Sequence, residues 1–195
     1  FVIGNGESRK PIALENLKGT TIGCNALYRD FTPDHLVAID DSMLSEIINS
    51  KYDLTHSVFC WCKESVHRLK EKNRCNIKFI RKRGEFLNFY RWSAGSTATF
   101  VATVLKPKII YLLGLDFSAS TESGDVNNVY KGTNGYEAHS GAELDKNQWQ
   151  TLQVIEENPR INFIRVCGKD SYSASCTLKN YKEITIEEFK KDHGC

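Results

Sequence analysis

The chain has 195 residues, of which 41% are hydrophobic, and its 26 basic and 24 acidic residues leave a formal net charge of +2. This composition provides the core of about one domain and excludes a disordered chain, a collagen-like repeat and a pure coiled coil. The charges are too balanced to indicate binding to nucleic acid, so we expect no nucleic-acid partner.

Neither the hydropathy nor the cysteines indicate a membrane or secreted protein. The longest apolar stretch, 97–115, is interrupted by Lys106, Pro107 and Lys108, and a transmembrane helix needs about 20 apolar residues. We therefore expect no integral membrane segment, and the sequence shows no signal-peptide pattern. The seven cysteines are irregularly spaced and form no CxxC pair, which favours a reducing, cytoplasmic location over a disulfide scaffold or a zinc site.

Short apolar runs alternate with longer amphipathic segments along most of the chain. Such alternation is typical of an α/β fold, and we predict three layers around a mostly parallel central sheet of about seven strands. Residues 1–170 would form the single main domain, and 171–195 a C-terminal tail that could contain a short helix at 186–191. We expect strands at 1–3, 20–24, 36–39, 57–61, 77–80, 109–113 and 161–166, and helices at 41–49, 63–72, 93–105 and 142–156.

The motif GNGES at 4–8 directly follows the first expected strand. Its two glycines allow a tight turn close to a ligand, and the start of a following helix would offer free N–H groups to a phosphate. Arg9 takes the place of the third glycine of the dinucleotide fingerprint, and no Gly-Lys-Ser/Thr of a P-loop follows. The motif is therefore either a nucleotide-phosphate site or an ordinary turn between a strand and a helix.

Polar residues also follow other expected strands, at the sheet edge where α/β proteins bind ligands. Asn25 could hydrogen-bond a base or ribose or simply form a turn, and an amide here argues against a dehydrogenase. Asp40 and Asp41 could hold Mg²⁺ or cap a helix. Asp116 could act at the ligand or cap a helix. His139 lies in a polar stretch and is a candidate general base.

Three further expectations concern helices and loops in the second half of the chain. Ser93 should cap the helix 93–105, whose first turn Gly95 keeps small, and Pro107 should end it. Residues 118–141 are too long and too polar for a simple connection, so they form a mobile active-site loop or are partly disordered. Trp149 should pack the helix 142–156 against the sheet.

In their order, these motifs resemble the bacterial sialyltransferases that modify lipooligosaccharide, and the related MptE-like 6-hydroxymethylpterin pyrophosphokinases. The resemblance rests on GNG-x-S after the first strand, Asn after the second, Asp after the third, a small-residue helix and then IYLLGLDF at 110–117. His139-Ser140, a helix, the sequence INF at 161–163 and Cys167 extend it. It covers roughly residues 1–171, with a poor match around 41–80.

The resemblance implies a Rossmann-like domain that moves a sugar from a nucleotide-sugar donor to a glycan or small-molecule acceptor, with no metal or other cofactor. His139 would be the general base, and Asp116 is the second catalytic candidate. The residues expected to bind the donor nucleotide are Gly4, Asn5, Gly6, Ser8, Asn25, Asp40, Arg91, Ser93 and Gly95.

The chain also departs from these sialyltransferases. They carry a tyrosine directly after the Asp-Phe pair and another six residues later, and Ser118 and Gly124 occupy these positions here. Tyr130 and Tyr136, from the same loop, are the candidates to replace them. Two alternatives therefore stay open: an MptE-like pyrophosphokinase that uses ATP and Mg²⁺ beside the acidic residues, and a nucleotide-binding protein without catalytic activity.

Overall fold

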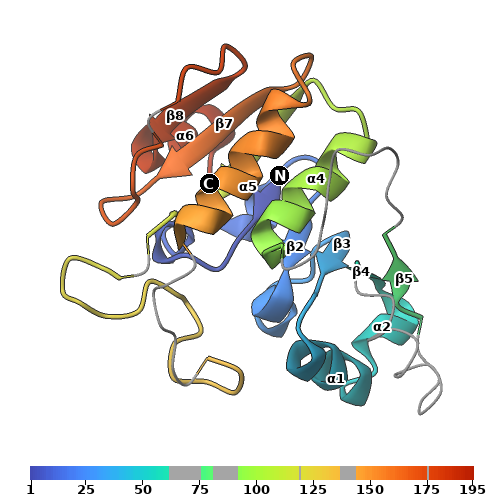
Figure 1. The fold of residues 1–195 in the computed structure, drawn as a ribbon. Coiled ribbons are helices and arrows are strands. Elements are labelled where there is room, and N and C mark those ends of the chain that lie inside the picture. Colours follow the sequence, from blue (N-terminus) through green and yellow to red (C-terminus); the bar gives the residue numbers. More distant parts are fainter. Residues whose placement is uncertain (62–75, 81–91, 119, 137–143, 175) are drawn as a thin grey trace.

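A computed structural model describes residues 1–195 except 62–75, 81–91, 119, 137–143 and 175 (Figure 1). Eight strands form one sheet in the order β5-β4-β3-β2-β1-β6-β7-β8, and all neighbouring strands in it are parallel. This confirms the predicted Rossmann-like α/β fold, with eight strands rather than about seven. The strands are β1 (Val2–Ile3), β2 (Ile22–Cys24), β3 (His35–Val37), β4 (Ser57–Cys60), β5 (Lys78–Phe79), β6 (Ile109–Leu113), β7 (Asn162–Cys167) and β8 (Tyr181–Thr185).

The direction of strand addition reverses at β1. The chain first adds β2, β3, β4 and β5 on one side of β1, and then returns to add β6, β7 and β8 on the other side. Connections on the two sides of such a switch point diverge, and they leave a crevice beyond the carboxyl ends of the two central strands. In this chain the crevice lies beyond β1 and β6.

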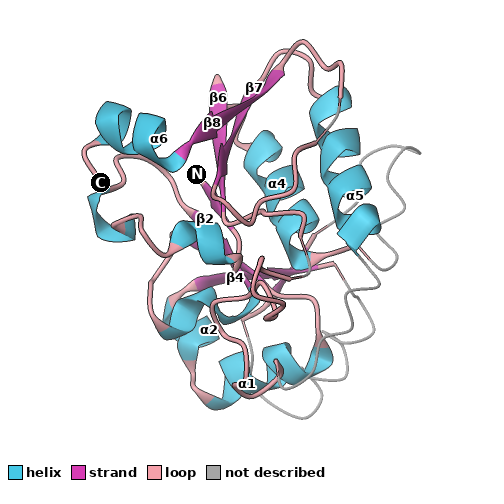
Figure 2. Ribbon diagram, turned by 90° about the vertical axis from the view of Figure 1, so that its left-hand side faces the viewer, coloured by secondary structure: helices cyan, strands magenta, loops and turns pink. Residues whose placement is uncertain are grey.

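Helices cover both faces of the sheet. The helices are α1 (Asp41–Asn49), α2 (Tyr52–Thr55), α4 (Ala94–Val104), α5 (Leu144–Glu156) and α6 (Ile186–His193), with 3-10 turns η1 (Glu7–Arg9), η2 (Leu14–Asn16) and η3 (Asn25–Arg29). α4 and α5 cover one face, and α1 and α6 lie on the other (Figure 2). Because successive side chains of a strand point to opposite faces, Val2 joins the core cluster of Ala98 in α4, whereas Ile3 joins that of Phe189 in α6.

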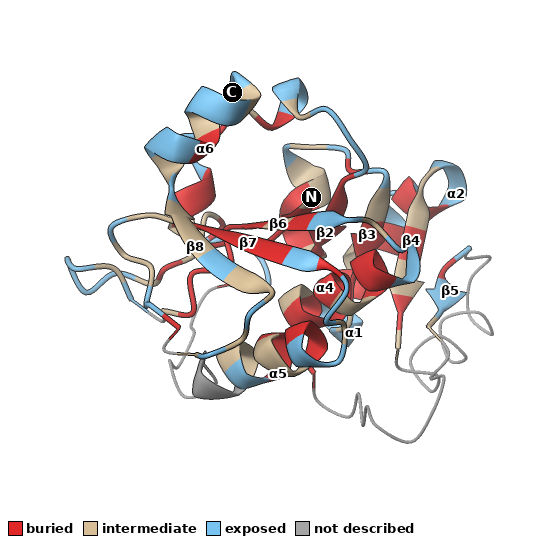
Figure 3. Cartoon of the chain, turned by 90° about the horizontal axis from the view of Figure 1, so that it is seen from above, coloured by how far each residue is buried: buried red, intermediate tan, exposed pale blue. Residues whose placement is uncertain are grey.

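Residues 171–195 contain β8 as well as α6. β8 pairs with β7 along its whole length, and α6 begins at a capping box between Thr185 and Glu188. Phe189 is fully buried, whereas the outer face of α6 is exposed (Figure 3). The sequence does not predict β8, because this edge strand is partly exposed and its YKEIT sequence alternates in polarity rather than forming an apolar run.

The expected helices that fall within the described residues are found, with one correction to their packing. Ser93 caps α4, and its side chain accepts a hydrogen bond from the Ser96 N–H. The expectation for Trp149 is wrong, since this side chain is 55% exposed and α5 buries Val154 and Ile155 instead. The expected helix 63–72 lies outside the described residues. Within the described residues, no helix has the length and apolar character needed to cross a membrane.

Candidate functional site

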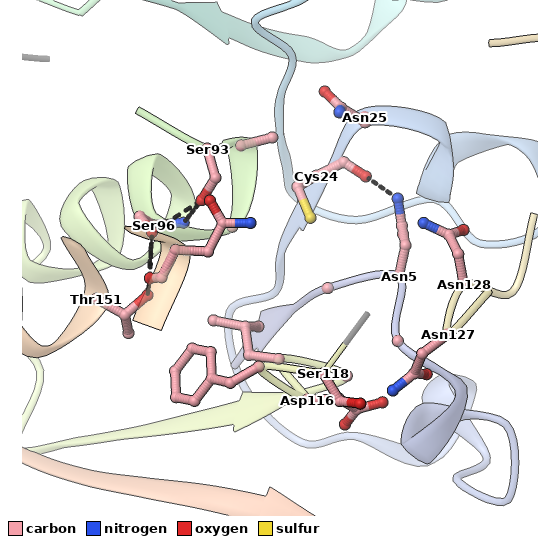
Figure 4. Close-up of a pocket in the computed structure, with 18 of the residues that line it drawn as sticks. Asn5, Cys24, Asn25, Ser93, Ser96, Asp116, Ser118, Asn127, Asn128 and Thr151 are labelled. Atoms are coloured by element: carbon pink, nitrogen blue, oxygen red, sulfur yellow. Dashed lines mark hydrogen bonds between the residues drawn. The ribbon is translucent and has the colours of Figure 1, made fainter. Parts of the chain in front are cut away.

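A cavity of about 230 Å³ lies in the crevice beyond β1 and β6 (Figure 4). Its wall is formed by the turn after β1, the end of β2, the first turn of α4, the segment 114–118 after β6, the loop 127–136 and one side of α5. The cavity therefore lies at the edge of the sheet where the sequence predicts a ligand.

Most of the predicted site residues meet at this cavity. The predicted residues on its wall are Gly4, Asn5, Gly6, Asn25, Ser93, Gly95 and Asp116. The described wall includes neither Ser8 nor Asp40, whose Oδ2 accepts a hydrogen bond from the wall residue Asn25. Arg91 and His139 lie outside the described residues.

The Gly-Asn-Gly turn packs closely against the end of β6 and the residues after it, rather than forming an open phosphate-binding loop. The Gly4 N–H donates to the Leu113 carbonyl at 2.7 Å and the Gly6 N–H donates to the Gly114 carbonyl at 2.9 Å. The segment after the turn is the short 3-10 turn η1, in which the Ser8 N–H donates to Asp116 Oδ2 at 3.1 Å. These N–H groups are already hydrogen-bonded, which favours the ordinary turn of the two alternatives that the sequence leaves open.

The first turn of α4 is the part of the wall best suited to an anion. The first N–H groups of a helix have no partner within it, and the helix dipole places partial positive charge there. Ser93 Oγ accepts from the Ser96 N–H at 3.1 Å, and the Ser93 N–H donates to Gln150 Oε1 at 2.9 Å. Ser96 Oγ lies 3.0 Å from Thr151 Oγ1. These bonds fix the start of α4 against α5.

Two asparagines of the wall have amide oxygens with no hydrogen-bond partner among the described residues. Asn5 Nδ2 donates to the Cys24 carbonyl at 3.2 Å and to Tyr136 Oη at 3.3 Å. Asn25 Nδ2 donates to Asp40 Oδ2 at 3.0 Å, so Asp40, at the N-cap position of α1, makes no side-chain capping bond. No described residue hydrogen-bonds to the buried Oδ1 of Asn5 or Asn25. Leaving such acceptors unpaired is unfavourable, so this side of the cavity has hydrogen-bonding capacity that the described residues do not satisfy.

Asn127 presents the opposite polarity. Its Oδ1 accepts a hydrogen bond from the Glu7 N–H at 2.8 Å, which fixes the orientation of the amide. Its side chain is 8% exposed, and no described residue accepts a hydrogen bond from its buried Nδ2. Figure 4 shows Asn127 near Asp116 and Ser118, at the end of the cavity away from Ser93. This end therefore contains a donor that the described residues do not satisfy.

Asp116 is buried and connects the wall segment 114–118 to η1 and to residues 171–172. Its Oδ2 accepts from the Ser8 N–H at 3.1 Å, its Oδ1 accepts from Ser171 Oγ at 2.8 Å, and its carbonyl accepts from the Tyr172 N–H at 2.8 Å. These bonds give Asp116 an organising role, and its catalytic role stays a prediction. Among the described residues, no group of three or more His, Cys, Asp or Glu could hold a metal ion.

Of the two candidate replacement tyrosines, Tyr136 lines the cavity. Burial raises the pKa of Tyr136 to about 12, so its hydroxyl keeps its proton at neutral pH. Tyr130 is engaged elsewhere, because its hydroxyl donates to Asp30 and accepts from Arg9 Nη2. Only Tyr136 is therefore placed to contact a ligand.

The sequence does not predict Asn127, Asn128 or Cys24 as wall residues. The adjacent asparagines in a long polar loop are the only signal for the first two. Burial raises the pKa of Cys24 to about 12, and its Sγ donates to the Ile3 carbonyl at 3.3 Å. Since the thiolate is the reactive form, Cys24 forms part of the wall and is not a nucleophile at neutral pH.

No protein-family model, curated protein or solved structure matches this chain significantly. The resemblance to the sialyltransferases therefore depends on the motif residues, and a function has to be argued from the cavity.

Proposed function

We propose that this chain is a sialyltransferase-like glycosyltransferase, and that the cavity beyond β1 and β6 binds the nucleotide of its sugar donor. The observation that carries the proposal is the position of a cavity lined by amides in this crevice, beside the start of α4. Ligands of open α/β sheets bind at such a switch point, and the start of a helix favours a phosphate.

The polarity of the wall supports a nucleotide. Asn5 and Asn25 line the cavity with amide groups, which can hydrogen-bond a ribose or a base, and the first turn of α4 suits a phosphate. The volume of about 230 Å³ is below the roughly 300 Å³ at which pockets for drug-sized ligands begin. The cavity thus suits the nucleotide part of the donor, and the sugar would extend towards the acceptor.

In the proposed reaction, the acceptor hydroxyl attacks the anomeric carbon of the donor sugar. A bond forms between the acceptor oxygen and this carbon, while the bond from this carbon to the phosphate oxygen breaks. The nucleotide leaves with the electron pair and its negative charge, and the hydroxyl proton passes to His139. The start of α4 and the hydroxyl of Tyr136 would stabilise the departing phosphate, and holding both substrates in line would supply much of the rate.

A thermal-shift experiment with CMP, CDP, UDP, GDP, ADP and ATP, each with Mg²⁺ and with chelator, tests the donor site. A ligand at about 100 times its dissociation constant should stabilise the protein by roughly 2.7 kcal/mol. We expect a response to a pyrimidine nucleotide that persists in chelator. A response to ATP that requires Mg²⁺ would favour the pyrophosphokinase instead, and no response to any of them would contradict a nucleotide site.

A substitution that adds a charge to the wall tests whether the nucleotide binds in this cavity. Asn25→Asp places a negative charge on the cavity wall and should weaken nucleotide binding at least about tenfold, because like charges in a binding site are strongly unfavourable. Asn49→Asp, the same change at an exposed position of α1, is the control and should bind as the original protein does. Equal affinities of the two variants would place the nucleotide elsewhere.

The role of His139 requires a kinetic test. Removing a general base typically costs about a hundredfold or more in rate, so His139→Ala should lose at least that much transfer activity. Nucleotide binding should persist, because the proposed role of His139 is at the acceptor. His56→Ala, which changes a histidine stacked on Tyr52 in α2, serves as the control and should keep its rate. Full transfer by His139→Ala would remove this residue from the mechanism.

A further inference from the structure

The loop 126–136 brings three side chains to the cavity, namely Asn127, Asn128 and Tyr136. Although the sequence suggests that this region is mobile or partly disordered, the loop is fastened to the first half of the fold. The Val129 N–H donates to the Asn5 carbonyl at 2.8 Å. Further along the loop, the buried Tyr130 hydroxyl bonds with Arg9 and Asp30. The position of this part of the cavity wall therefore depends on the hydrogen bonds that attach the loop.

The most extensive attachment is the ion pair of Arg29, in η3, with Glu46, in α1. Arg29 Nε donates to Glu46 Oε1 at 2.8 Å, and Nη2 donates to Oε2 at 2.6 Å, which is a two-point pairing. The same guanidinium donates to Thr133 Oγ1 and to the Asn134 carbonyl, both at 2.8 Å. Asn134 Nδ2 in turn donates to Glu46 Oε2 at 3.0 Å. Both partners of the ion pair therefore hydrogen-bond to the loop, Arg29 through its guanidinium and Glu46 through its carboxylate.

Arg29 also lies against the aromatic rings of the loop. Its guanidinium carbon is 5.5 Å from the ring centre of Tyr130 and 5.9 Å from that of Tyr136, a cavity residue. The Arg29 guanidinium lowers the pKa of Glu46 to about 2, so both partners are charged at neutral pH. The side chains are only 21% and 24% exposed, so solvent screens the pair less than a surface ion pair.

We propose that Arg29 and Glu46 are positioning residues, which hold the loop 126–136 so that its asparagines and Tyr136 are in place before a ligand arrives. The described cavity wall includes neither of them, so they act through the loop and not on the ligand. The identity of the ligand rests on the proposed function, whereas the role of the pair in holding the loop does not. A site that must be ordered during binding has a lower apparent affinity than a site that is already formed.

The first measurement is hydrogen exchange of the ligand-free protein, because it does not depend on the proposed function. Arg29→Gln keeps a polar side chain but loses the charge and the two-point pairing. We expect the amides of 126–136, above all that of Val129, to exchange at least about tenfold faster, while those of β6 and β7 are unchanged. Arg160→Gln, at an exposed position, is the matched control and should show no change. Unchanged exchange in Arg29→Gln would overturn the proposal.

The second measurement is the affinity for CMP by titration calorimetry. Arg29→Gln and Glu46→Gln should each raise the dissociation constant about fivefold or more, and Arg29→Lys, which keeps the charge, should recover part of the loss. Faster exchange with an unchanged dissociation constant would overturn the positioning role, because the pair would then only stabilise the loop. If the original protein binds neither CMP nor CDP nor UDP, the donor assignment fails, and the exchange experiment alone decides whether the pair holds the loop.

Discussion

Replacing Gly4 with alanine should lower the free energy of unfolding by about 3 kcal/mol, or roughly 10 °C in melting temperature for a chain of this length. A Cβ at Gly4 would lie 2.4 Å from the Gly114 carbonyl oxygen and 2.9 Å from Leu115 Cδ1. The carbonyl cannot move away easily, because it accepts the Gly6 N–H and because Gly114 already has a φ of +62°. The clash therefore separates the ends of β1 and β6, on which the cavity depends.

The same substitution at Gly95 is the control. Gly95 also lines the cavity, but a Cβ there would meet only Leu115, at an ordinary distance of 3.7 Å. Because alanine is favoured over glycine in helices, Gly95→Ala should be as stable as the original protein or slightly more so. Urea unfolding of both variants gives the comparison. A Gly4→Ala protein as stable as the Gly95→Ala protein would contradict the close approach of the two turns.

The Gly-Asn-Gly turn shows which local features the sequence predicts and which it does not. Two glycines after an apolar strand predict a tight turn, and the turn is there. The requirement for glycine at these two positions comes from their contact with the end of β6, which is more than a hundred residues away in the sequence. Gly4 and Gly6 leave room for the Gly114 carbonyl, and their N–H groups bond to β6 and to the turn after it. A contact between such distant segments leaves no mark in the local pattern, so the sequence alone does not decide between a phosphate site and an ordinary turn.

The same distinction between local patterns and long-range contacts explains which strands and which site residues the sequence predicts. Central parallel strands are buried on both faces and appear as short apolar runs, so β1, β2, β3, β4, β6 and β7 are predicted from the sequence. The exposed edge strand β5 is also predicted, within 77–80. Polar residues after such strands must meet at one edge of the sheet, which explains why Asn5, Asn25 and Asp116 are placed correctly. The loop residues Asn127 and Asn128 follow no such rule, because the loop is held by bonds to residues far away in the sequence, from the Glu7 N–H to Asn127 and from the Val129 N–H to the Asn5 carbonyl.

Replacing Arg165 with methionine should have the largest effect on stability, about 3–5 kcal/mol, which is typical for breaking a buried ion pair. Arg165 lies in β7 and is fully buried. Its Nη2 donates at 2.6 Å to both Glu183 Oε1 and the Tyr172 carbonyl, and its Nη1 donates to the Leu115 carbonyl at 3.0 Å. Its Nε donates to Tyr181 Oη at 2.8 Å. Methionine fills much of the volume but leaves these acceptors without their donor.

The loss should also reach the cavity, because Arg165 supports its wall from behind. The Arg165 guanidinium carbon lies 4.5 Å from the ring centre of Phe117, and Leu115 and Phe117 both line the cavity. Phe117 has a φ of +54°, which is unfavourable for a bulky residue, so it needs this support. Arg165→Lys, which keeps the charge but not the planar fork, should be destabilised less than Arg165→Met, and it provides a folded variant for binding measurements.

The pH dependence separates the ion pair from a simple packing effect. Burial alone would raise the pKa of Glu183, but the hydrogen bonds from Arg165, the Ala174 N–H and Tyr181 outweigh it and lower this pKa to about 2. A carboxyl group with a lowered pKa stabilises the folded protein above its unfolded pKa of about 4.3, and this contribution is lost as the pH falls towards 2. The difference in unfolding free energy between the original protein and Arg165→Met should therefore be largest near pH 7 and shrink below about pH 4.5.

Urea unfolding between pH 7 and pH 3 measures this difference directly. Glu46, whose pKa is also lowered to about 2 by Arg29, adds the same acid sensitivity to both proteins and cancels from the comparison. Arg160→Met, at an exposed position, is the control and should change stability by less than about 0.5 kcal/mol at any pH. If the loss in Arg165→Met were the same at pH 7 and pH 3, the missing volume and neutral hydrogen bonds would explain it, and the charge of Glu183 would have no part in holding β7, β8 and the cavity wall together.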